Sequence, residues 1–170
     1  MNVIRTLENY IVKVELFFLI LSLAVMVLLA FLQVVLRNVF SSGFLWADTF
    51  LRYLVVWVGF IGAAIAAKEE RHISIEVLTK FVSPTIKNLA SLITNLAAAI
   101  VCYYLYTASV QFLEFGLSPD TLVFESIPLL YVFSIIPIGF LLMLFHFIIR
   151  AVLKTELIMK SGILGAGGKA

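Results

Sequence analysis

Four long apolar runs alternate with short polar segments along this chain, at about residues 16–36, 46–67, 88–113 and 127–149. Each run can cross the roughly 30 Å of bilayer hydrocarbon, which takes about 20 helical residues. Lipid offers no partner for backbone polar groups, and the period-two alternation of a membrane barrel is absent, so the runs are predicted to be helices. We therefore predict an all-α membrane protein with four transmembrane helices in one domain, residues 1–160.

Amphipathic patterns flank these spans. Apolar residues recur at helical spacing over residues 3–14, which predicts an amphipathic helix lying at the membrane interface before the first span. A similar pattern over residues 73–82 predicts an interfacial helix between the second and third spans. Ser83-Pro84 is typical of a helix start and is expected to open the third span. The Gly- and Ala-rich residues 161–170 are expected to form a disordered tail.

Composition and charge placement support a membrane protein and give it a direction. The 170 residues are 63% hydrophobic and 13% charged, whereas soluble domains carry about 25% charged residues. Ten of the twelve Lys and Arg residues lie in the N-terminal segment, the middle loop and the C-terminal end, and only Arg37 and Arg52 lie on the opposite side. Positive charge marks the cytoplasmic side, so both termini are predicted to be cytoplasmic. The net charge of +2 gives no indication of nucleic acid binding.

Ionisable groups are sparse in the spans. The centres of the first, third and fourth runs contain no charged residue or histidine, and Glu15 lies at the cytoplasmic entrance of the first, where its carboxylate can stay hydrated. His72 and His146 raise the alternative of haem ligation, but without supporting spacing they are interpreted as ordinary interfacial residues. The single Cys102 is interpreted as a small buried hydrophobe. We predict no enzyme, no catalytic, substrate or metal site, and no cofactor.

The remaining polar residues gather at the outer ends of the first two spans. Arg37 ends the first span, while Asp48 and Arg52 are four residues apart in the second, a spacing at which opposite charges can pair. The short turn at residues 41–43 brings these ends together, so Asp48 could bridge both arginines. Two interpretations stay open: an interhelical clamp that neutralises the charges, or a docking point for another subunit.

Small residues define one face of the second span. Gly59, Ala63 and Ala67 form a small-xxx-small row, with Gly62 and Ala66 beside it. Such rows let helices approach closely, either within this chain or against a larger partner.

Aromatic residues and a proline complete the candidate set. Trp46 is expected to anchor the second span at the interface and Trp57 to offer a large packing surface. Pro137 is expected to kink the fourth helix. The candidate interface or clamp residues are Arg37, Trp46, Asp48, Arg52, Trp57, Gly59, Gly62, Ala63 and Ala67.

Several motifs together suggest a family. In order, they are QVVLRNVF at residues 33–40, WAD at 46–48, Arg52, WVGFIGAA at 57–64 and HISIE at 72–76. With these motifs and its four spans, the chain resembles the small membrane subunit of tripartite ATP-independent periplasmic (TRAP) transporters. The family pattern has an aromatic residue where Asn38 stands and often glutamate where Asp48 stands; both departures are mild.

The resemblance implies a function in organic acid uptake across the bacterial inner membrane. In this family a periplasmic substrate-binding protein captures a dicarboxylate or sialic acid, and a large transmembrane subunit imports it by an elevator-like motion driven by a sodium gradient. The small subunit binds no substrate and braces the large one within the membrane lipids. The acidic segment 114–125 would face the periplasm, as a solvated loop or a contact for the binding protein. Alternatives are a stand-alone small transporter and a membrane anchor of a redox complex.

Overall fold

The computed structural model describes the backbone of residues 2–68, 84–117, 122–123 and 127–166, and the side chains of residues 6–68, 88–117, 122–123 and 127–159. Within these ranges four helices are long and apolar enough to cross a membrane, as predicted. The four long helices are α1 (Asn2–Phe40), α2 (Leu45–Lys68), α4 (Pro84–Gln111) and α6 (Ile135–Ala166). The connection from α4 to α6 contains η1 (Phe112–Gly116), β1 (Leu122–Val123), β2 (Ile127–Pro128) and α5 (Leu129–Phe133).

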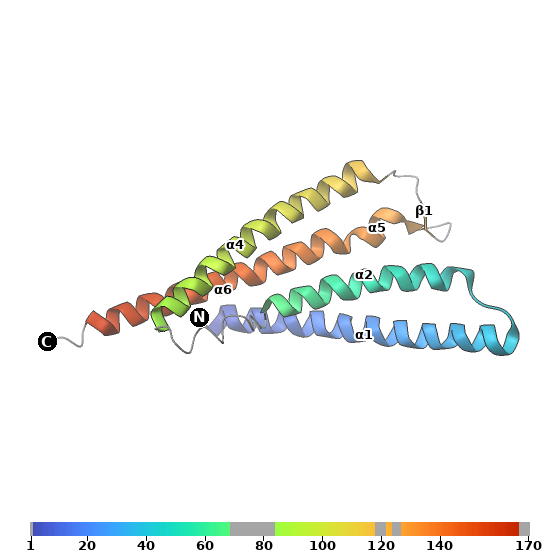
Figure 1. The fold of residues 1–170 in the computed structure, drawn as a ribbon, viewed down its shortest axis with the longest axis horizontal. Coiled ribbons are helices and arrows are strands. Elements are labelled where there is room, and N and C mark those ends of the chain that lie inside the picture. Colours follow the sequence, from blue (N-terminus) through green and yellow to red (C-terminus); the bar gives the residue numbers. More distant parts are fainter. Residues whose placement is uncertain (1, 69–83, 118–121, 124–126, 167–170) are drawn as a thin grey trace.

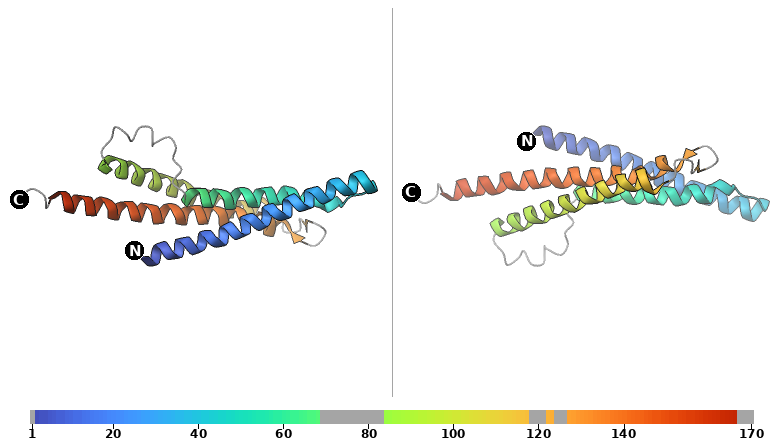
Figure 2. Two further views of the ribbon diagram at one scale, coloured as in Figure 1. Left: turned by 90° about the horizontal axis from the view of Figure 1, so that it is seen from below. Right: turned by 90° about the horizontal axis from the view of Figure 1, so that it is seen from above.

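The long helices lie side by side in the order α1, α2, α6 and α4, and the main contacts are between neighbours in this row (Figure 1). After a 90° turn the helices overlap in the middle, whereas toward the end that holds the N-terminus α1 and α4 diverge to opposite sides of α6, so the arrangement is more open than a compact bundle (Figure 2). Only 6% of the most apolar stretch of α1 is buried within the chain, against 28% for the span that contains α6. Large apolar surfaces are therefore left for lipid or another membrane protein to cover.

The two ends of the chain depart from the predicted boundaries. No glycine or proline separates residues 3–14 from the first span, and α1 is one unbroken helix of 39 residues, about 58 Å long at 1.5 Å per residue. The prediction of a separate interfacial helix there was wrong. α6 continues to Ala166, so the prediction of disorder was also wrong for residues 161–166. The pattern at 73–82 and Ser83 lie outside the described residues, whereas Pro84 is the first residue of α4.

The fourth span is interrupted near its outer end. α5 ends at Phe133, Ser134 forms a turn, and α6 begins at Ile135. Pro137 explains the position of this break, because proline has no amide hydrogen for the carbonyl four residues earlier, that of Phe133, and its ring crowds that group. The expected kink is thus a break between two helices. The antiparallel pairing of β1 with β2 just before it was not predicted from the sequence.

Candidate subunit interface and polar contacts

A buried side-chain amide joins α1 to the start of α2. Gln33 on α1 is 5% exposed. Its Nε2 donates a hydrogen bond to the carbonyl of Phe44 at 2.9 Å, and its Oε1 accepts one from the Phe44 amide at 3.1 Å. Ser41, with φ of 48°, places the backbone in the left-handed region and ends α1. The turn predicted from residues 41–43 is therefore fixed by two hydrogen bonds to one glutamine.

The predicted charge cluster beside this turn is simpler than expected. Arg37 Nη2 donates to Asp48 Oδ2 at 2.8 Å, but both side chains are exposed, by 62% and 46%. Arg52 is exposed too, and among the described residues it makes no ion pair with Asp48. Within the described residues the clamp between α1 and α2 thus consists of Arg37 and Asp48, and Arg52 is not part of it.

We expect Gln33→Leu to destabilise the chain more than Asp48→Asn. The leucine leaves both backbone groups of Phe44 without their partner, which costs about 1–3 kcal/mol of unfolding free energy where water does not replace the bonds. Exposed ion pairs contribute about 0–1 kcal/mol. Thermal unfolding of the two variants in the same detergent measures the difference. An equal or larger loss for Asp48→Asn would show that the ion pair, rather than the amide, holds this turn.

One face of α2 packs on the α5–α6 segment through aromatic side chains. Trp57 Nε1 donates to the carbonyl of Val132 at 3.0 Å. Farther along, the rings of Phe60 and Phe140 meet edge-on at a centroid distance of 5.2 Å. The helices approach closely at Gly139, where an added Cβ would lie 2.6 Å from Cδ1 of Phe60. This inward face explains the large packing surface expected of Trp57.

The opposite face of α2 is uncovered. Arg52, Gly59, Ala63 and Ala66 are all exposed, and a Cβ built at Gly59 would meet no atom within 4 Å. Ala67 by contrast is only 9% exposed. The small-residue row of the sequence is therefore divided: Gly59 and Ala63 face outward, and Ala67 faces the interior of the chain.

The flanks of this outward face contain two further candidates. Gly62 is half-buried, and a Cβ built there would also meet no atom within 4 Å. Trp46, at the outer end of α2, is 47% exposed, and its ring stacks at a tilt on Phe44 with a centroid distance of 5.6 Å. A Cβ at Gly62 would therefore cause no collision within the chain, and the exposed part of the Trp46 side chain can face lipid.

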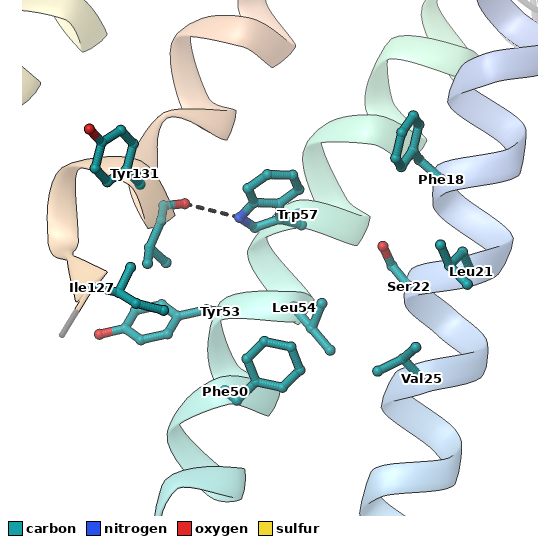
Figure 3. Close-up of a pocket in the computed structure, with 11 residues that line it drawn as sticks. Phe18, Leu21, Ser22, Val25, Phe50, Tyr53, Leu54, Trp57, Ile127 and Tyr131 are labelled. Carbon is teal, nitrogen blue, oxygen red and sulfur yellow. Dashed lines mark hydrogen bonds between the residues drawn. The ribbon is translucent and has the colours of Figure 1, made fainter. Parts of the chain in front are cut away.

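An open apolar cleft of about 500 Å³ lies between α1, α2 and α5 (Figure 3). None of its lining residues is charged, and the indole N–H of Trp57 already donates to Val132. A carboxylate ligand would find no cation there to offset the loss of its hydration, so the cleft is unsuited to an organic acid. The lining residues are Phe18, Leu21, Ser22, Val25, Phe50, Tyr53, Leu54, Trp57, Ile127, Tyr131 and Val132.

A buried polar cluster lies toward the other end of α1, and sequence reasoning missed it. His146 of α6 is fully buried, with Nε2 at 3.2 Å from Glu15 Oε1 and Nδ1 at 3.6 Å from Glu8 Oε1. Glu8 and Glu15 are 6% and 5% exposed, so the interpretation of Glu15 as hydrated and of His146 as an ordinary interfacial residue was wrong. With a carboxylate against each ring nitrogen, His146 offers no open position to a haem iron, which weakens the redox-anchor alternative.

These features define a multi-pass helical membrane protein with polar contacts between its helices, an uncovered small-residue face and a cleft unsuited to a charged ligand. Residues 26–156 match the family described as tripartite ATP-independent periplasmic transporters, DctQ component, and the chain belongs to this family. It is accordingly a small permease subunit of a TRAP transporter, a transport subunit and not an enzyme.

Curated relatives agree with this assignment. The chain is 37% identical over 109 residues to a Haemophilus influenzae protein described as a TRAP transporter small permease protein, covering 64% of this chain and 68% of the relative. It is 27% identical over 81 residues to the C4-dicarboxylate TRAP transporter small permease protein DctQ of Vibrio cholerae, covering 48% and 35% of the two chains. It is also 27% identical over 124 residues to the sialic acid TRAP transporter permease protein SiaT of Haemophilus influenzae, covering 68% of this chain and 19% of SiaT.

Proposed function

We propose that this chain braces the large transport subunit of a sodium-gradient-driven importer of organic acids in the bacterial inner membrane. The brace lies within the bilayer with both termini in the cytoplasm. A periplasmic substrate-binding protein delivers the substrate, a dicarboxylate or a sialic acid, to the large subunit. This chain binds none of the substrate and supplies a fixed surface against which its partner is held.

The observation that carries this proposal is the similarity to SiaT. The match covers 68% of this chain but 19% of SiaT, so in that relative the corresponding segment is continuous with a much longer polypeptide. A separate chain of the same kind needs a surface through which to hold a larger membrane partner. The open arrangement of the helices supports this, because it leaves most of α1 and one face of α2 uncovered.

The outward face of α2 is the surface we assign to that contact. Gly59, Ala63 and Ala66 leave the backbone accessible, so a partner helix can approach closely and pack by dispersion and weak hydrogen bonds. Arg52 lies on the same exposed face, and a guanidinium near the hydrocarbon is costly unless a carboxylate, a backbone carbonyl or the interface receives it. The partner is therefore expected to present small residues along one helix and an acceptor near its outer end.

Co-purification from native membranes tests the proposal. The tagged chain is extracted in mild detergent, and the proteins that accompany it are identified and quantified by mass spectrometry. We expect a stoichiometric, much larger multi-pass membrane protein. After reconstitution with the binding protein and an inward sodium gradient, the complex should take up a labelled dicarboxylate or sialic acid, and this chain alone should take up neither.

The other outcomes distinguish the alternatives. Uptake by this chain alone would support a stand-alone transporter, and a haem absorption band in the purified complex would support a redox anchor. A chain that purifies only with copies of itself would contradict the brace. Uptake by the complex without a sodium gradient would retain the brace and overturn the sodium coupling.

A further inference from the structure

We propose that Glu8, Glu15 and His146 form a proton-binding site that joins α1 to α6, with one proton on each nitrogen of the imidazole ring. Glu15 and His146 are 131 residues apart in the chain, and all three side chains are at least nine-tenths buried. The proposed function uses none of them. A buried group of three ionisable side chains inside membrane-spanning helices is costly and calls for a role of its own.

The proposal of two ring protons rests on the positions of the two carboxylates. A carboxylate only accepts hydrogen bonds, and a neutral imidazole has one N–H and one bare lone pair. Here Glu15 Oε1 is 3.2 Å from Nε2 and Glu8 Oε1 is 3.6 Å from Nδ1, so each ring nitrogen has a carboxylate oxygen within ion-pair distance. A neutral ring would direct a lone pair at one carboxylate and repel it. An imidazolium directs an N–H toward both and offsets one of their two negative charges.

Other polar and charged side chains of the described residues lie on the elements around the cluster. Lys68 Nζ, at the end of α2, donates at 2.8 Å to Oδ1 of Asn9, the residue that follows Glu8 in α1. On α6 itself, Arg150 lies one turn beyond His146 and has interactions of its own. The described side chains of α4 include no charged residue. Among the described residues Glu15 Oε2 and His146 Nδ1 have no hydrogen-bond partner, and the electrostatic attraction among the three side chains offsets part of the cost of burying them.

The cluster also bridges a gap between two helices. α1 and α6 are not among the helix pairs with the main contacts. Two open apolar cavities of about 300 and 420 Å³ lie between them, and Ile11 and Leu142 contribute to the lining of both. With so little apolar packing there, the ion pairs to His146 are the polar link that holds the first half of α1 against α6. Loss of one of the two ring protons would leave two carboxylates beside a neutral ring and loosen this link. The link should therefore weaken as pH rises.

Nitrogen NMR of the histidine ring tests the proton assignment. The sequence has only two histidines, so His72→Gln leaves His146 as the sole signal in the full chain, embedded in lipid vesicles and labelled with ¹⁵N-histidine. At pH 7 we expect two protonated ring nitrogens, the imidazolium pattern. One protonated and one bare nitrogen at pH 7 would overturn the proposal. This measurement leaves Glu8, Glu15 and His146 unchanged, so its result does not depend on whether a variant of the cluster folds.

Thermal unfolding across a pH series tests the role of the proton. In the chain with native residues, the melting temperature should fall over the pH range in which the ring loses its second proton. The double variant Glu8→Gln, Glu15→Gln should lose this fall. The matched control is Glu114→Gln, which removes an exposed glutamate in η1, directly after α4, and should retain the fall in melting temperature. An unchanged pH dependence in the double variant would contradict the proposal.

Discussion

Gly139→Leu is expected to separate α2 from α6 and to lower the free energy of unfolding by about 3 kcal/mol, at the upper end of the usual cost of overpacking. Even a Cβ at this position would lie 2.6 Å from Cδ1 and 2.9 Å from Cβ of Phe60. The Cβ of Phe60 is fixed by the α2 backbone, so a rotation of its ring cannot relieve the contact. The helices must move apart, and the edge-on contact between Phe60 and Phe140 is lost with them.

Thermal unfolding in detergent, followed by tryptophan fluorescence, measures this effect. Gly62→Leu is the matched control, since a Cβ at Gly62 meets no atom within 4 Å, whereas a Cβ at Gly139 meets Phe60. The emission of Trp57 should shift to the red in Gly139→Leu, because its hydrogen bond to Val132 joins α2 to α5, the short helix that leads directly into α6. Equal stability of the two variants would show that α2 and α6 do not approach as closely as described.

The sequence predicts the spans well because their signal is local. Each long helix follows from an apolar run that must satisfy its backbone within itself in lipid, and this holds whatever the neighbouring helices do. The ends of the helices are less predictable. Residues 3–14 have the pattern of an interfacial helix, but no residue between them and the span stops the helix, so α1 continues through. Hydrophobic periodicity cannot distinguish one long helix from two joined ones.

The polar cluster could not be predicted, and the reason is its distance along the chain. Glu8 and Glu15 are seven residues apart, two turns of one helix, and therefore share a face. This spacing is a weak signal that they act together. Their partner His146 lies 131 residues after Glu15, and only the packing of α1 across α6 brings it to them. By contrast, only one short turn separates the helix ends that contain Arg37 and Asp48, so their pairing could be predicted from the sequence.

The position of α1 shows how a layer of helices can be held together without a large core. Its most apolar stretch is almost entirely uncovered, and the polar contacts lie toward its two ends. Gln33 and Arg37 join it to the start of α2, and Glu8 and Glu15 join it to α6. The apolar middle, beside the open cleft, is left for lipid or for a partner. Such a helix can keep its position while a neighbouring subunit packs along its length.

The double variant Gly59→Leu, Ala63→Leu is expected to lose the large subunit while the chain itself stays folded in the membrane, an expectation that rests on the proposed function. Both residues are exposed on α2, and a Cβ at Gly59 meets nothing, so leucine causes no collision within the chain. Against a partner helix, two leucines would hold the backbones apart and remove the close packing on which association in lipid depends. We expect the affinity to fall at least about tenfold, or about 1.4 kcal/mol.

Quantitative co-purification with the large subunit measures this loss, and Ala97→Leu is the control. Ala97 is likewise exposed, but it lies on α4, at the other edge of the row from α1. If Ala97→Leu retains the partner and the double variant does not, the outward face of α2 is the contact. If both retain it, the partner is bound through another surface, and the long uncovered side of α1 becomes the stronger candidate because it is the least covered of the four spans. Loss in both variants would show that association responds to any added bulk, and the assignment to α2 would then fail.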